Sequence, residues 1–145
     1  MIYLSADKHG LTAIHIVENY LSDRKLAYEY IGIKDARDDV MLEKLIPPFV
    51  EKVKASSQNK GIISCGTGVG VEIGVNRFAG IRGCLAVNPK IAQWASVYDK
   101  CNVLCLPSWE CTKQNIHGVL DAWLTADYDG NLGRLKSFEI FDTWH

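Results

Sequence analysis

The 145-residue sequence has no run of about 18 apolar residues, so no segment of it is long enough to cross a membrane as a helix. It also has almost no net charge: 16 Lys and Arg residues face 17 Asp and Glu residues, which excludes a strongly basic nucleic-acid-binding surface. The start, MIYLSADKHG, lacks the basic and apolar regions of a signal peptide. We therefore expect a cytoplasmic protein that binds neither nucleic acid nor membrane and folds as a single domain over residues 1–145.

Metal-binding spacings are absent as well. The five cysteines include no Cys-x-x-Cys pair, and the four histidines include no His-x-x-x-His pair. An odd number of cysteines without a secretory signal indicates free thiols. We expect neither a metal nor a cofactor, and we interpret Cys84, Cys101 and Cys105, which lie in apolar runs, as packing residues.

Short apolar runs alternate with segments of helical periodicity. We expect strands at 2–6, 27–33, 61–65, 80–87 and 102–107, and helices at 11–21, 40–53, about 69–77, 89–98, 112–124 and 132–141. Pro47 and Pro48 should kink or restart the second helix. The alternation predicts an α/β fold of three layers, α/β/α and Rossmann-like, with a five-stranded parallel sheet. The extra C-terminal helix has an apolar face for the core or for a second subunit.

Two polar loops are expected to meet at one edge of this sheet. Ligands of open parallel sheets bind beyond the carboxyl ends of the strands, where the strand order reverses. With the common order beginning 2-1-3, the loops after the first and third strands are neighbours there. These loops are Asp7-Lys8-His9-Gly10 and Cys65-Gly66-Thr67-Gly68-Val69-Gly70.

The second loop combines a thiol with the features of an anion site. Its glycines leave backbone N–H groups unshielded, and the following helix directs its positive end to the same place, which favours the thiolate form of Cys65. A thiolate beside an oxyanion-stabilising loop can remove a proton alpha to a carbonyl, and Thr67 can hydrogen-bond the developing oxygen charge. Glu72, in the next helix, is a weaker candidate for the base.

Spacing excludes three other types of glycine-rich loop. The pattern Gly-x-x-x-x-Gly-Lys-Ser/Thr of a nucleotide P-loop is absent, and a dinucleotide fingerprint would follow the first strand. A phosphatase loop of the Cys-x5-Arg type needs Arg where Val71 stands. A purely structural turn is the remaining alternative to a site.

With both loops considered, the sequence resembles the type B ribose-5-phosphate isomerases and their galactose-6-phosphate isomerase relatives over nearly the whole chain. The strongest block is GIISCGTGVGVEIGVNRFAGIRG at 61–83, and blocks at 102–104 (NVL) and 121–124 (DAWL) also match. The resemblance implies a metal-free interconversion of aldose and ketose phosphates through an ene-diolate. It implies that Cys65 is the base, that Thr67 and the amides of residues 66–70 stabilise the intermediate, and that Asp7 and Asn76 bind the sugar. It also implies a homodimer, or a dimer of dimers, with shared active sites.

The departures from the family pattern fall on substrate-binding positions. In the first loop Lys8 stands at the family's His position and His9 follows it. The ring-opening His-Asn pair, which the family supplies across the dimer interface, is replaced by Tyr98-Asp99, and a phosphate-binding Arg is replaced by Trp109. In the C-terminal segment Leu132 and Gly133 replace Arg and His. The remaining candidate phosphate ligands are Lys8, Arg134 and Lys136.

The residues that the resemblance assigns to the proton transfer are retained, whereas several substrate-binding residues are replaced. This pattern indicates a different substrate. A tetrose phosphorylated on its terminal oxygen cannot close the usual furanose, so it needs no ring-opening His. We therefore expect a sugar phosphate isomerase for a tetrose or another non-standard sugar. Four alternatives stay open: Tyr98 acts as the acid, the sugar is unphosphorylated, the chain is a non-catalytic partner subunit, or Cys65 has a thiol redox role.

Overall fold

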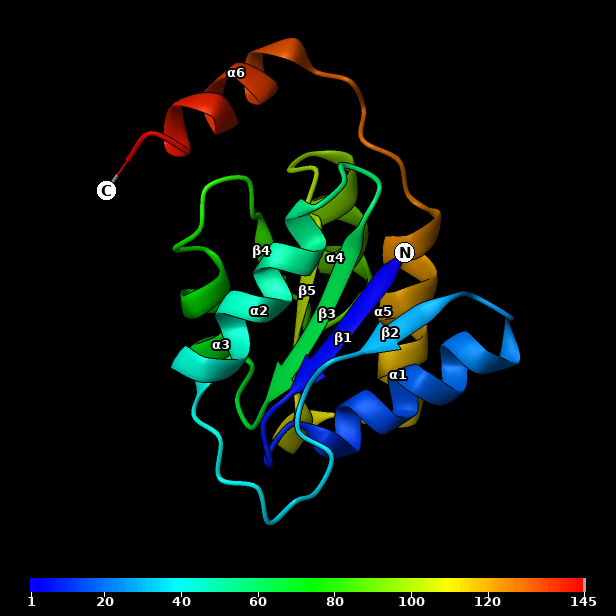
Figure 1. Cartoon of the computed structure of the whole chain (residues 1–145). Helices are drawn as coiled ribbons and strands as arrows, with labels where there is room; N and C mark the ends of the chain where they lie inside the picture. Colours follow the sequence, from blue (N-terminus) through cyan, green and yellow to red (C-terminus); the bar gives the residue numbers. More distant parts are fainter. Residues whose placement is uncertain (145) are drawn as a thin grey trace.

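The computed structural model describes residues 1–144, and His145 lies outside the described part. Within residues 1–144 a five-stranded parallel sheet has the order β2-β1-β3-β5-β4 (Figure 1). The strands are β1 (Ile2–Ala6), β2 (Tyr28–Tyr30), β3 (Lys60–Cys65), β4 (Gly83–Leu85) and β5 (Val103–Pro107). The helices are α1 (Leu11–Asp23), α2 (Leu42–Lys54), α3 (Val69–Val75), α4 (Pro89–Val97), α5 (Lys113–Thr125) and α6 (Leu132–Phe141), with a 3-10 turn η1 (Ser108–Glu110) after β5.

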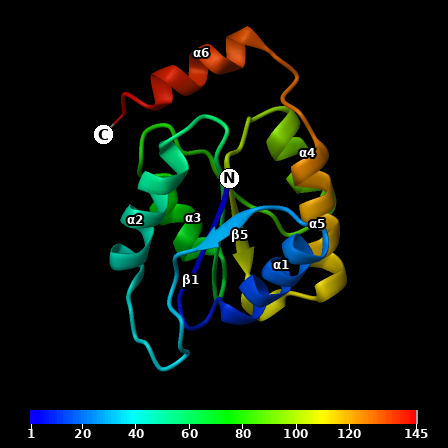
Figure 2. The ribbon, with the colours of Figure 1, turned by 45° about the vertical axis from the view of Figure 1, so that its right-hand side comes forward.

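The sheet separates two apolar cores, because successive side chains of a strand point to opposite faces. Ile62 of β3 and Leu104 of β5 pack with α1, α4 and α5, whereas Ile63 and Val103 pack with α2 and α3. Figure 2 shows these two helical layers on either side of the strands. The expected three-layer α/β/α fold is thus confirmed.

The edge strands β2 and β4 are three residues long, shorter than the apolar runs expected to form strands at 27–33 and 80–87. Helix α2 runs through Pro47 and Pro48 as one element, so of the expected kink or restart the restart does not occur. Its buried face, which includes Phe49 and Val50, packs on the sheet and offsets the hydrogen bonds that the prolines cannot donate.

Helix α6 lies across the amino-terminal end of the sheet, apart from the two helical layers (Figures 1 and 2). None of its side chains is buried, so the chain's own core is not the partner expected for its apolar face. It touches the body at few points: the Gly80 N–H donates to Asp142 Oδ1 at 2.8 Å, and the Arg82 guanidinium lies 5.5 Å from the centre of the Phe138 ring. Among residues 1–144 no helix has the length and apolarity needed to cross a membrane.

Candidate active site

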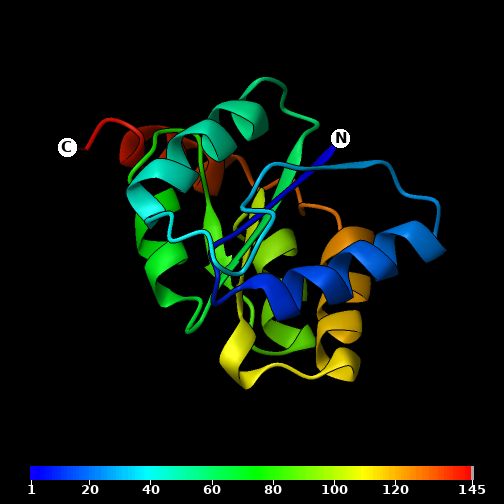
Figure 3. The same cartoon turned by 60° about the horizontal axis from the view of Figure 1, so that its bottom comes forward.

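The loops after β1 and β3 meet at the carboxyl edge of the sheet, as expected. The Asp7 N–H donates to the Ser64 carbonyl at 3.4 Å, and a Cβ on Gly10 would lie only 2.1 Å from the Ser64 oxygen. The two loops therefore touch backbone to backbone, and Gly10 permits this approach because it has no side chain. Figure 3 turns this edge of the sheet forward.

The first loop is shaped by its own aspartate. Asp7 Oδ1 accepts hydrogen bonds from the N–H groups of His9 (3.0 Å) and Gly10 (2.9 Å), so this carboxylate oxygen fixes the start of α1. Lys8 forms an ion pair with Asp39, with 2.7 Å between Nζ and Oδ1, and this contact lowers the pKa of Asp39. Lys8 thus has a carboxylate partner within its own chain.

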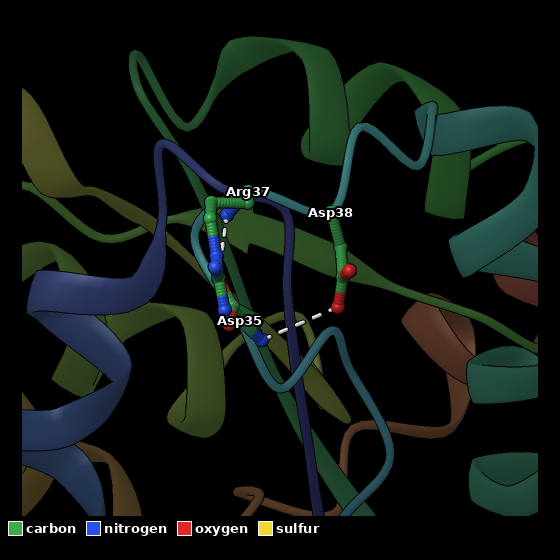
Figure 4. Close-up of polar contacts among 3 residues, drawn as sticks. All are labelled: Asp35, Arg37 and Asp38. Carbon is green, nitrogen blue, oxygen red and sulfur yellow. Dashed lines mark hydrogen bonds and ion pairs between the residues drawn. The ribbon is translucent and has the colours of Figure 1, made fainter.

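Asp39 belongs to the segment 31–41 between β2 and α2, where no sequence motif points to the site. This segment extends past the carboxyl ends of the strands (Figure 1). Its turn is held by Arg37, which contacts both carboxylate oxygens of Asp35 at 2.9 and 2.5 Å, while the Asp35 N–H donates to Asp38 Oδ2 at 3.3 Å (Figure 4). Scattered loop charges carry no periodic pattern, so only the fold identifies Asp39 as the partner of Lys8.

Cys65 ends β3 and is 6% exposed, with its side chain on the α2 and α3 face of the sheet. Its Sγ lies 3.9 Å from the position that a Cβ on Gly70 would take. Gly68 has φ of 75°, and a Cβ there would come within 3.0 Å of the Leu106 and Pro107 backbone. Glycine is therefore needed at 68 both for its conformation and for its contact with β5.

The exposed part of this loop consists of Thr67 and Val69. The Thr67 hydroxyl accepts a hydrogen bond from the Val69 N–H at 3.2 Å, which leaves its own proton available for a ligand. The loop therefore combines an exposed hydroxyl at Thr67 with a thiol at Cys65 that is almost fully shielded from solvent.

Trp109, in η1, lies directly on this loop. Its backbone N–H donates a hydrogen bond to the Gly66 carbonyl at 2.9 Å. A Cβ on Gly66 would lie 2.4 Å from Cε2 of the Trp109 indole. The His9 ring meets the indole edge to face, with 5.5 Å between the ring centres. The structure thus gathers His9, Trp109 and the Cys65 loop from the ends of β1, β5 and β3.

Glu72 lies in α3 and Asn76 directly follows this helix, and both side chains form hydrogen bonds to β4. The Asn76 side chain donates to the Gly83 carbonyl at 3.0 Å and accepts from the Gly83 N–H at 2.8 Å. Glu72 Oε1 accepts from the Leu85 N–H at 2.8 Å. Within this chain both side chains therefore attach the edge strand to α3, and neither is brought to the Cys65 loop.

Tyr98, Asp99, Arg134 and Lys136 lie at the opposite end of the sheet, because α4 returns the chain to the start of β5. The Arg134 guanidinium lies 5.4 Å from the centre of the Tyr98 ring and forms an ion pair with Asp129, which raises the pKa of Arg134. Lys136 is exposed on α6. Within a single chain Lys8 therefore lies at the other end of the sheet from Arg134 and Lys136, and the assignment of these residues as phosphate ligands stays a prediction.

A groove of about 890 Å³ lies between α6 and the body. Asn76, Asp99, Cys84 and Cys101 line it on the body side, and Phe138 and Trp144 line it from the C-terminal segment. Of the cysteines interpreted as packing residues, Cys105 is buried, whereas Cys84 and Cys101 are only half-buried. In residues 1–144 no group of three or more Cys, His, Asp or Glu side chains is arranged to hold a metal ion.

Comparison with known proteins identifies the family. The sequence model of the Ribose/Galactose Isomerase family matches residues 2–137. The chain is 34% identical over 136 residues to a probable ribose-5-phosphate isomerase B from Mycoplasma genitalium, covering 89% of this chain and 86% of the relative. It is 25% identical over 107 residues to D-erythrulose-4-phosphate isomerase 2 from Mycolicibacterium smegmatis, covering 74% of this chain and 70% of the relative.

Solved structures agree with this assignment. A ribose 5-phosphate isomerase from Thermotoga maritima superposes with a TM-score of 0.92 at 25% identity, covering 99% of this chain and 97% of that one. Ribose-5-phosphate isomerase B from Mycoplasma genitalium, solved with bound ribulose-5-phosphate, gives a TM-score of 0.82 at 32% identity, with coverage of 97% and 93%. The chain therefore belongs to the ribose/galactose isomerase family, and it is a sugar phosphate isomerase of the aldose–ketose type.

Proposed function

We propose that this protein interconverts an aldose phosphate and a ketose phosphate of four carbons, with Cys65 moving the proton between C2 and C1. The observation that carries the proposal is the contact between the Cys65 loop and the Asp7–Gly10 loop at the carboxyl edge of the sheet. In support of the proposal, the Cys65 loop carries a shielded thiol and, two residues on, a hydroxyl whose proton is available for a ligand.

The chemistry needs no electron acceptor, because the reaction only moves hydrogen within the substrate. The Cys65 thiolate takes the proton from C2 of the open-chain aldose, and the electron pair of that C–H bond forms the C1–C2 double bond of an ene-diolate. The hydroxyl proton of O2 moves to O1, and the proton held by Cys65 then returns to C1, which leaves the carbonyl on C2. Thr67 and the N–H groups of the glycine loop stabilise the oxygen that carries the negative charge.

Two observations favour a four-carbon substrate. Tyr98-Asp99 stands where the family pattern has its ring-opening pair, and a tetrose with its phosphate on the terminal oxygen has no furanose to open. A relative that covers 74% of the chain is named for erythrulose 4-phosphate. A five-carbon substrate is the second candidate, because the 34% identical relative is named for ribose 5-phosphate.

The opposite placement of Tyr98 and Cys65 favours a site shared between two copies. In a dimer with twofold symmetry, the amino-terminal end of one sheet can face the carboxyl edge of the other, and the contact is made twice. Tyr98, Asp99 and the α6 cations Arg134 and Lys136 would then reach the Cys65 loop of a second copy.

The test is solvent proton exchange in deuterated water, followed by NMR, with erythrulose 4-phosphate and ribulose 5-phosphate. Wild type should exchange and isomerise, with higher kcat/KM for the four-carbon compound, and Cys65→Ala should lose at least about 100-fold in rate. Cys84→Ser, on β4 and outside the loop, is the matched thiol control and should keep wild-type activity.

Two results would oppose the proposal in different ways. Exchange that survives Cys65→Ala removes Cys65 as the base but leaves catalysis standing. A folded wild-type protein that exchanges neither compound contradicts catalysis and favours a non-catalytic partner subunit.

A further inference from the structure

Trp109 is fixed on the Cys65 loop by contacts on three sides. Its backbone N–H donates to Gly66, its indole meets the His9 ring at an angle of 75°, and the neighbouring Ser108 hydroxyl accepts the Ala13 N–H at 3.2 Å. These contacts connect η1 to β3, to the first loop and to α1. Despite them Trp109 is 65% exposed, so most of its surface is available to a ligand.

The chemistry of that surface determines which part of a sugar phosphate it can accept. An indole face is apolar and carries the negative side of the ring quadrupole, so it packs well against C–H groups. A phosphate placed there would lose its hydration without gaining hydrogen-bond donors, apart from the single indole N–H. The β5 side of the loop is therefore suited to the carbon chain of the substrate.

We propose that Trp109, positioned by His9, is a specificity-determining residue that limits the length of the sugar phosphate reaching Cys65. This inference rests on the proposed function, in which the reacting carbons lie over the Cys65 loop. The indole occupies the volume beside Gly66, where a side chain as small as a methyl group would collide with it. An added CHOH unit on this side has to displace a ring that its neighbours hold in place.

The first measurement compares kcat/KM for ribulose 5-phosphate with kcat/KM for erythrulose 4-phosphate in wild type and variants. Trp109→Ala should raise this five-carbon to four-carbon ratio by about tenfold or more, since one carbon unit against a pocket wall is worth at least that much discrimination. Trp109→Phe should give a smaller rise, and His9→Ala a smaller rise still. Trp94→Ala, on α4 and 44% exposed, removes an exposed indole elsewhere and should leave the ratio unchanged.

The second measurement separates this inference from the proposed chemistry. Calorimetric titration of Cys65→Ser, with and without Trp109→Ala, gives the ratio of the two dissociation constants without turnover. A ratio that shifts toward the five-carbon compound supports the length limit even if Cys65 proves not to be the base. The length limit is overturned if Trp109→Ala changes the ratio of the two dissociation constants by less than twofold. It is also overturned if the variant loses kcat/KM and binding equally for both compounds.

Discussion

Gly10 is the residue at which the two loops of the site touch. A Cβ there would lie 2.1 Å from the Ser64 oxygen, 2.4 Å from the Ser64 carbonyl carbon and 3.0 Å from the Cys65 nitrogen. All three are backbone atoms at the end of β3, so no rotamer change can relieve the collision. The position of Cys65 relative to the first loop therefore depends on this one missing side chain.

Gly10→Ala should lower the free energy of unfolding by about 2 kcal/mol or more, because the loops must separate to admit the methyl group. It should also lower kcat/KM, since the first loop moves away from Cys65. Urea unfolding and isomerase assays measure the two effects. Gly133→Ala, in α6, is the control: its Cβ would meet only the Asn131 side chain, at 3.3 Å, and alanine is the better helix former. Equal stability of the two variants would contradict the close approach.

The residues of the site differ in how far the sequence predicts them. Cys65 and Thr67 lie within one short glycine-rich segment, so their chemistry and their place after a strand follow from local order. The contact of Trp109 with Gly66 and the pairing of Lys8 with Asp39 join positions far apart in the chain. No local pattern encodes such contacts, and they follow only from the strand order and the loop conformations.

At the scale of elements, apolar periodicity is a good predictor of burial. It is a poorer predictor of which residues form ladder hydrogen bonds in the sheet. Ile31 and Ile33 still donate to β1 carbonyls at 2.9 and 3.3 Å, although β2 ends at Tyr30. Ile81 is buried against α2 and α3 although β4 begins two residues later. Such runs therefore predict strands longer than the structure contains.

The attachment of β4 to the turn before β5 brings two thiols together. The neighbouring Cys101 thiol lowers the pKa of Cys84, and the Cys84 thiol together with burial raises the pKa of Cys101. Both side chains line the groove beneath α6. Iodoacetamide should therefore alkylate Cys84 several-fold faster than Cys101 near neutral pH, since the thiolate is the reacting form.

Peptide mass spectrometry of briefly treated native protein measures the two rates. Cys101→Ala removes the neighbouring thiol and should slow the alkylation of Cys84, and in urea the two cysteines of the wild type should react alike. Faster alkylation of Cys101 in the native protein would contradict these pKa directions.

At the scale of the whole molecule, the candidate site residues are divided between the two ends of one sheet. Cys65 lies at the carboxyl edge, and Tyr98 with the cations of α6 lies at the amino edge. A single copy of the chain therefore cannot bring them together, which leads to a complementation test.

Cys65→Ala should be nearly inactive alone, and Arg134→Ala, which removes a candidate phosphate ligand, should be strongly impaired, yet the two should regain activity when mixed under conditions that exchange subunits. In a mixed dimer one of the two sites has both residues intact, so random pairing should restore about a quarter of wild-type activity. Assays before and after mixing, with size-exclusion chromatography, measure this recovery. An Arg134→Ala variant with full activity, or a mixture that gains no activity, would contradict a shared site.

The strand order also determines which strands form the two lateral edges of the sheet. Its two outermost strands, β2 and β4, have three residues each, whereas the three inner strands have five or six. An exposed edge is a template on which another chain can add a strand, and a short edge offers few donors and acceptors for this. The fold therefore resists edge-to-edge aggregation at high concentration, and a contact between copies of the chain would have to use helices and loops.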